Sequence, residues 1–178
     1  MMGVQELVCR DLCRMRESVE HAGSGLEFAV SFFEIYGGRC LDLLNGRRAV
    51  TIREDGEGKV QAVGLSEAVC SSEDDLLGAV HAGNEARTTH STAMNDVSSR
   101  SHAICEIMVR HASSGKIRGK LALIDLAGSE RAADTRHHNH QRRRESAEIN
   151  KSLLALKECI RALDAGSSHV PFRASKVS

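Results

Sequence analysis

Apolar residues recur at helical spacing near both ends of the chain. Near the amino terminus the recurring positions are Val4, Val8, Leu12, Met15 and Val19. Near the carboxyl terminus they are Ile149, Leu153, Leu156, Ile160 and Leu163. A spacing of three to four residues places such side chains on one face of a helix. We therefore expect two one-sided helices, each burying its apolar stripe, while the charged residues of the second face solvent or a partner: Lys151, Lys157, Glu158 and Arg161.

Shorter apolar stretches between these helices predict strands. Residues 26–36 are almost continuously apolar and are bounded by glycines, which is typical of a central strand buried on both faces. Asn45-Gly46 and residues 55–58 provide turns between neighbouring strands. Residues 120–125 form a further apolar run, which we interpret as a buried strand. The remaining strands are expected at 41–44, 50–53, 60–63 and 103–109.

A third helix is predicted to begin at Ser72. Ser72 followed three residues later by Asp75 resembles a capping box, and Leu76, Leu77 and Val80 supply the apolar face. Glycine and asparagine at 83–84 indicate the end of this helix. Strands that alternate with helices favour an α/β fold, with a central, mostly parallel β-sheet flanked by helices on both faces, in one domain over residues 1–178.

Composition restricts the possible partners and the compartment. Lys plus Arg balance Asp plus Glu at 24 each, so the net charge does not favour nucleic acid or an anionic membrane, and any binding face must be local. The six cysteines show neither a C-x-x-C pair nor zinc spacing, which predicts reduced thiols in an intracellular protein. No apolar run approaches the length of a membrane span, and no signal peptide is expected.

An acid and a glycine end the apolar run at 120–125. Asp125 closes the run, and Gly128 follows three residues later. In a nucleotide-hydrolysing fold such an aspartate holds Mg²⁺ through water, while the glycine amide meets a terminal phosphate. The alternative is a strand that simply runs into a turn.

A second polar segment offers complementary chemistry. Residues 95–102 (N-D-V-S-S-R-S-H) bring hydroxyls, an amide and a guanidinium into one loop before a strand, and these groups suit a phosphate and its metal. The alternative is a serine-rich turn without a ligand.

Together the two segments resemble the switch loops of the kinesin motor superfamily, whose patterns are N-x-x-S-S-R-S-H and D-L-A-G-S-E. Further resemblances are F-F-E-I-Y at 32–36 with D-L-L-N at 42–45, I-N-K-S-L at 149–153, and H-V-P-F-R-A-S-K at 169–176. Residues 131–135 and 155–163, including K-E-C, are most similar to the microtubule-depolymerising kinesin-13 class.

The resemblance implies roles in a site for ATP and Mg²⁺. Arg100 and Glu130 would form a salt bridge over the γ-phosphate, and Ser99 would ligate the metal. Ser98 and Asn95 would orient the lytic water and the phosphate. Asp125 would hold the metal through water and Gly128 would sense the γ-phosphate. If Arg100 and Glu130 are instead a surface pair, they contribute only ~0–1 kcal/mol.

The resemblance also implies tubulin as the partner, and a cytoplasmic, cytoskeletal location. Because tubulin surfaces are acidic, the expected microtubule-binding residues are mainly cationic: Lys151, Lys157, Arg161, Arg142, Arg143, Arg144, His169, Arg173 and Lys176. Residues 136–144 hold four arginines and three histidines, which by themselves are typical of a solvated loop. Two rival interpretations are nucleic acid, for which stacking aromatics are lacking, and a metal site at His137, His138 and His140.

A phosphate loop of the G-x-x-x-x-G-K-[ST] type does not occur among the 178 residues. By the resemblance, the chain begins after that loop and stops before the last helix and strand of the motor domain. Two functions therefore remain open. One is a fragment of an ATP-dependent microtubule motor, with depolymerase as the expected class. The other is a catalytically inactive remnant that at most binds tubulin.

Overall fold

The computed structural model describes residues 2–18, 23–54, 56, 60–93, 100–128 and 140–176. The helices are α1 (Met2–Glu17), α2 (Glu73–Ala93), α3 (His140–Asp164) and the short 3₁₀ helix η3 (Phe172–Ala174). The strands are β1 (Leu26–Tyr36), β2 (Arg39–Asp42), β3 (Arg48–Glu54), β4 (Val60–Val63), β5 (Ala68–Cys70), β6 (His102–His111) and β7 (Ile117–Asp125). Within the described ranges, no helix combines the length and the apolar character that a membrane crossing requires.

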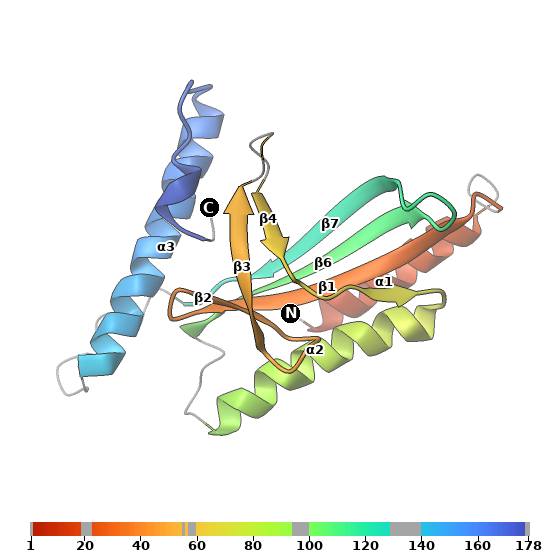
Figure 1. The fold of residues 1–178 in the computed structure, drawn as a ribbon, viewed down its shortest axis with the longest axis horizontal. Coiled ribbons are helices and arrows are strands. Elements are labelled where there is room, and N and C mark those ends of the chain that lie inside the picture. Colours follow the sequence, from red (N-terminus) through yellow and green to blue (C-terminus); the bar gives the residue numbers. More distant parts are fainter. Residues whose placement is uncertain are drawn as a thin grey trace.

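The sheet has the strand order β4-β3-β2-β1-β6-β7, and β5 pairs with β1 beside β2 (Figure 1). All strand pairs in the described part of the chain are antiparallel, so the expectation of a mostly parallel sheet is wrong. Parallel neighbours need a crossover of a dozen or more residues. Here β1 and β2 are instead joined by Gly37 and Gly38, whose φ angles of 55° and 70° suit glycine in a tight turn.

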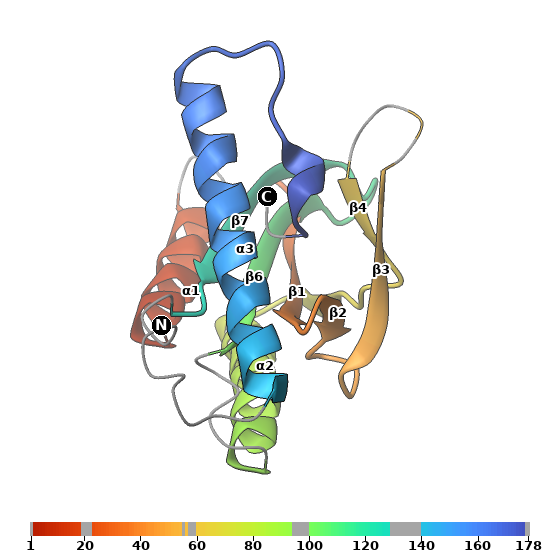
Figure 2. The ribbon, with the colours of Figure 1, turned by 90° about the vertical axis from the view of Figure 1, so that its left-hand side faces the viewer.

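The main core lies between one face of the sheet and two helices. Figure 1 shows α1 and α2 side by side beneath β1 and β6. Phe28, Val30 and Phe32 point from β1 into this core, where they meet Leu76 and Val80 of α2. The opposite face of β1 is covered by the β3–β4 hairpin rather than by the helices that we expected there. The helix α3 stands across the end of the sheet (Figure 2).

The start of α2 agrees with its sequence signature, and its end does not. The Asp75 amide donates to Ser72 Oγ (3.1 Å), and Asp75 Oδ2 accepts from the Ser72 amide (3.0 Å), so the capping box is confirmed. The predicted end at 83–84 is wrong, because α2 continues to Ala93. Gly83 serves a close approach instead: a Cβ at this position would lie 2.1 Å from Phe32 Cδ1.

The buried faces of α1 and α3 agree only in part with the predicted stripes: Val8 and Leu12 pack against the core, and Ile149 is buried. In α1 the buried residues are Gln5, Cys9 and Cys13, whereas Val4 and Met15 are 54% and 58% exposed. In α3 the buried residues include Ile149, Ser152, Ala155 and Cys159, whereas Ile160 and Leu163 are exposed. Polar members of these faces have partners: Asn84 Nδ2 donates to Gln5 Oε1 (2.9 Å), and Ser152 contacts His102. The exposed charges of α3 agree with the prediction.

The strand β7 is an edge strand rather than a buried one. Its only partner in the described sheet is β6, and Leu121 and Ile124 are 39% and 48% exposed. An edge strand presents one row of backbone donors and acceptors to its surroundings. Asp125, the residue that ends this strand, therefore lies at the boundary of the sheet.

Two acids of the F-F-E-I-Y and D-L-L-N segments are structural. Glu34 is fully buried and pairs with Arg47. Asp42 is also fully buried, and its carboxylate accepts from the amides of Leu44 (2.9 Å) and Ser66 (2.8 Å). These carboxylates fix the turn after β2 and the segment before β5, since a buried acid must find donors.

Candidate functional site

Several predicted site residues lie outside the described part of the chain. They are Asn95, Ser98, Ser99 and Glu130, together with His137 and His138. The side chains of His140, Arg142 and Arg143 are not described either. The structure therefore places Arg100, Asp125 and Gly128 of the expected nucleotide site, and most of the expected filament-binding residues.

The two predicted switch segments meet at one end of the sheet. Ala103 of β6 lies opposite Asp125 of β7 in the antiparallel register. Arg100 lies two positions before His102, the first residue of β6. Gly128 lies three positions after Asp125, the last residue of β7. The antiparallel pairing brings the entry of one strand beside the exit of the other. The convergence needed for a shared ligand site is thus present in the backbone.

Asp125 has a partner that the sequence did not suggest. Arg87 Nη1 lies 2.6 Å from Asp125 Oδ2, and Arg87 Nη2 donates to the carbonyl oxygen of Ser101 (3.0 Å). The Arg87 guanidinium therefore joins α2 to both switch segments. We missed Arg87 because it lies beyond the residues where α2 was expected to end. The Asp125 side chain keeps 39% exposure, so the carboxylate still has an accessible side.

Arg100 pairs with Glu145 of α3, while its predicted partner Glu130 lies outside the described residues, so that pair stays a prediction. Arg100 Nη1 is 3.2 Å from Glu145 Oε2, and both side chains are less than one fifth exposed. Tyr36 completes this cluster by donating from its hydroxyl to Glu145 Oε1 (3.0 Å). Burial, with the Glu145 carboxylate second, raises the pKa of Tyr36. Arg100 is therefore not part of a solvent-exposed ion pair in this arrangement.

His102 forms a buried contact among three segments. Its Nδ1 accepts from the Ala127 amide (3.2 Å), and its Nε2 lies 2.8 Å from Ser152 Oγ. Burial, followed by the positive charge of Arg87, lowers the pKa of His102. The histidine ring thus connects β6, the segment after β7 and α3.

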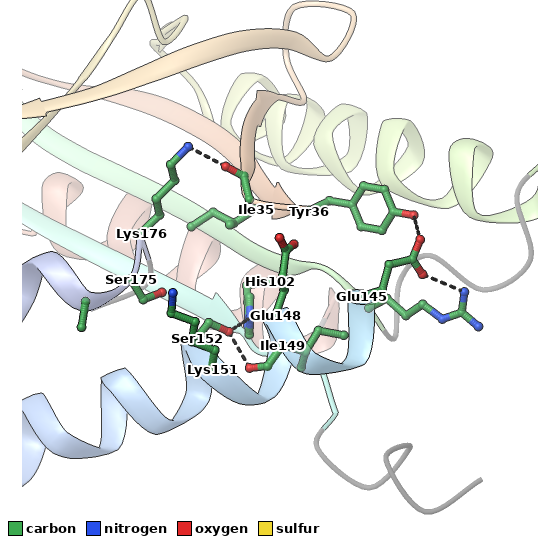
Figure 3. A pocket seen from close by; sticks show the side chains of 14 residues that line it. Ile35, Tyr36, His102, Glu145, Glu148, Ile149, Lys151, Ser152, Ser175 and Lys176 are labelled. Atoms are coloured by element: carbon green, nitrogen blue, oxygen red, sulfur yellow. Dashed lines mark hydrogen bonds and ion pairs between the residues drawn. The ribbon is translucent and has the colours of Figure 1, made fainter. Parts of the chain in front are cut away.

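A cavity of about 180 Å³ opens between α3, the β1–β2 turn and the carboxyl-terminal segment (Figure 3). Glu145, Glu148 and Lys151 of α3 line it, together with Tyr36 and Lys176. Lys176 Nζ donates to the Gly38 carbonyl oxygen and so holds the carboxyl-terminal segment against the turn. The cavity mixes both charge signs.

The expected filament-binding residues with described side chains are exposed: Arg144, Lys151, Lys157, Arg161, His169, Arg173 and Lys176. Some of them already have acidic neighbours. Arg161 pairs with Glu158 (3.0 Å), and Arg173 pairs with Glu54 of β3 (2.6 Å). Arg161 and Arg173 are therefore partly neutralised by acids of this chain.

Comparison with known proteins agrees with this arrangement. The sequence model of the kinesin motor domain matches residues 1–178. The chain belongs to the kinesin motor-domain family. Diatom spindle kinesin-1 of Cylindrotheca fusiformis is 50% identical over 178 residues, which are 100% of this chain and 28% of that protein. The chain thus spans less than a third of this relative.

A solved structure of a fast kinesin supports the kinesin fold. It superposes with a TM-score of 0.76 at 35% identity, over 96% of this chain and 50% of that one. The predicted kinesin superfamily and the predicted partial motor-domain fold are therefore confirmed. The residue roles within this kinesin fold remain predictions.

Proposed function

We propose that this chain is the part of a kinesin motor domain that carries both nucleotide switches and the microtubule-binding helix. One observation carries the proposal: α3, with its exposed cations, lies directly against the sheet end where the two switch segments meet. Contacts between helix and switches are what a motor needs if filament binding is to influence the nucleotide site.

In the proposed nucleotide site, Asp125 would hold Mg²⁺ through water, since its carboxylate keeps an accessible side. Gly128 would present its amide to the γ-phosphate. Ser99 would ligate the metal, and Asn95 and Ser98 would orient the phosphate and the attacking water. Arg100 would pair with Glu130 over the γ-phosphate. When bound, Mg²⁺ would neutralise the charge that develops on the phosphate oxygens of ATP.

In the proposed filament-binding surface, Lys151 and Lys157 would face the acidic surface of tubulin, supported by Arg161, His169, Arg173 and Lys176. Arg142, Arg143 and Arg144 at the start of α3 would extend this surface. The proposed location is the cytoskeleton. The relative's name, spindle kinesin, supports that location and gives no support to the depolymerase class, so the proposal stops at a microtubule motor. The alternative, a tubulin-binding remnant, shares this surface but not the nucleotide chemistry.

Co-sedimentation with microtubules tests the surface. The variant Lys151→Ala with Lys157→Ala should bind more weakly at low salt, and both proteins should lose affinity as salt rises. The matched control is Lys116→Ala with Arg118→Ala, since these exposed cations lie on the β6–β7 hairpin at the far end of the sheet (Figure 1). If both double variants bound microtubules equally weakly, the binding would be nonspecific charge attraction. Absence of binding by the parent chain would contradict the proposal.

A further inference from the structure

His102 lies where three segments of the chain meet: β6, the segment after β7, and α3. Figure 3 shows its ring beside Ser152 of α3. The residue is only 2% exposed, and Ala127 and Ser152 are 4% and 9% exposed. Each contact lies next to a residue of the proposed function. Arg100 lies two positions before His102, Gly128 directly follows Ala127, and Lys151 directly precedes Ser152.

The hydrogen-bond partners determine the tautomer of the ring. The Ala127 amide can only donate, so His102 Nδ1 must be the unprotonated acceptor. Ser152 Oγ donates its one hydrogen to the Ile149 carbonyl oxygen (2.7 Å). Ser152 therefore accepts at Oγ, and Nε2–H of His102 must be the donor. Every polar atom of this junction has one assigned role, which is met only by neutral imidazole protonated at Nε2.

The surroundings favour the same neutral form. A proton on Nδ1 would face the Ala127 N–H and break that contact. It would also place a positive charge near the buried Arg87 guanidinium, which is 8% exposed and directed at Asp125. The hydrogen bonds of this junction therefore all run in one direction. The Ala127 amide donates to the ring, the ring donates to Ser152, and Ser152 donates to the backbone of α3.

We propose that His102 is a positioning residue that couples α3 to the segment containing Ala127 and Gly128. Displacement of Ser152 with α3 is passed through the ring to the Ala127 amide, and so to the amide of Gly128. The importance of this coupling for nucleotide sensing rests on the proposed function, whereas the mechanical link does not. A histidine that only fills the core would stabilise the fold without linking these two segments.

Two substitutions of His102 each keep one of the ring's two hydrogen bonds and remove the other. In His102→Asn the side-chain oxygen takes the place of Nδ1 and keeps an acceptor for Ala127, but the side chain does not reach Ser152. In His102→Gln the terminal amide takes the place of Nε2 and keeps the donor to Ser152, but the acceptor for Ala127 is lost. Ser152→Ala removes the contact from the α3 side.

Amide hydrogen exchange at Ala127, normalised to that of Cys105 within β6, tests the coupling. In the parent chain, Ser152→Ala should raise exchange at Ala127 by about fivefold, the equivalent of one lost hydrogen bond. In the His102→Asn background, Ser152→Ala should leave Ala127 unchanged. His102→Gln should raise exchange at Ala127 above that of His102→Asn. Equal effects of Ser152→Ala in both backgrounds, or no effect in the parent, would overturn the proposal.

Microtubules provide a second measurement. Adding them to the parent chain should slow exchange at Ala127, whereas His102→Asn should co-sediment equally well and show no slowing, because the exposed lysines of α3 are intact. Equal slowing in both proteins would overturn the coupling. Failure of the parent to co-sediment would instead contradict the proposed function, and the exchange measurement without microtubules would still decide the junction.

Discussion

The guanidinium of Arg87 holds the carboxylate of Asp125, with Nη1 2.6 Å from Oδ2, and so joins α2 to the end of β7. The same guanidinium donates to the Ser101 carbonyl oxygen before β6. One nearly buried cation therefore fixes both segments of the proposed nucleotide site. Its removal should change the position of the Asp125 carboxylate, which the proposed site would use.

Arg87→Met should lower the free energy of unfolding by about 1–3 kcal/mol, because it leaves the Asp125 carboxylate and the Ser101 carbonyl without this donor. The partial exposure of Asp125 keeps the expected loss below that of a fully buried pair. Urea unfolding followed by circular dichroism measures it. The control is Arg173→Met, whose pair with Glu54 is largely solvent-exposed and should contribute ~0–1 kcal/mol. A larger loss at Arg173 would contradict the assignment.

Two glycines of α2 should respond to alanine in opposite directions. Gly83→Ala should destabilise by about 1–3 kcal/mol, because the new methyl group overlaps the ring of Phe32. Gly78 has no atom within 4 Å of the corresponding position, so Gly78→Ala should stabilise by roughly 1 kcal/mol through helix propensity alone. Thermal unfolding of both variants gives the comparison. Stabilisation at Gly83 would show that α2 does not approach β1 this closely.

Stability should fall on acidification through His102. Because the pKa of this residue is lowered in the folded state, the unfolded chain binds the proton more readily. The neutral junction is therefore fully stable above the unfolded pKa of about 6.5 and weakens as pH falls below it towards the folded value. Arg87 of α2, itself paired with Asp125, is the charge that acts on the ring, and the cavity beside His102 is lined by Arg100, Glu145, Glu148, Lys151 and Lys176. His102→Asn should show a smaller decrease in the urea midpoint between pH 7.5 and 5.5, and an equal decrease would assign the effect to other histidines.

The purified 178 residues should not hydrolyse ATP. Their sequence holds the predicted switches but no G-x-x-x-x-G-K-[ST] loop to cradle the phosphates. A phosphate-release assay with and without microtubules measures this. Microtubule-stimulated turnover that is lost in Asp125→Asn would contradict the prediction.

Local signals in the sequence were reliable where the partner was also local. The capping box at Ser72 and Asp75 and the turn at Asn45-Gly46 involve neighbouring residues, and the structure contains them. Gly83 was misinterpreted because its role depends on Phe32, far away in the chain. The helical stripes were displaced for a similar reason: Ser152 and Gln5 are buried by distant partners, which periodicity alone does not reveal.

The same contrast between local signals and distant partners holds for the candidate site. Motif resemblance predicted Arg100, Asp125 and Gly128 as site residues, and the family comparison confirms the kinesin family but leaves these roles as predictions. Arg87, Glu145 and Ser152 were missed as partners, because each reaches the site from another element. The strand direction was wrong because alternating strands and helices favour a parallel sheet, whereas tight turns at 37–38 and 112–116 join these strands antiparallel.

The six free cysteines are all buried, and four of them, Cys9, Cys13, Cys70 and Cys105, belong to one core cluster. Burial raises the pKa of Cys9 and Cys70 to about 11 and that of Cys105 to about 12. Because only a thiolate in contact with solvent attacks an alkylating reagent, each thiol should remain unlabelled until its surroundings open. The chain thus carries an internal set of chemical reporters. Mass-resolved labelling of Cys105 in the sheet, Cys40 beside the hairpin and Cys159 on α3 would time the opening of three regions separately, without an introduced probe.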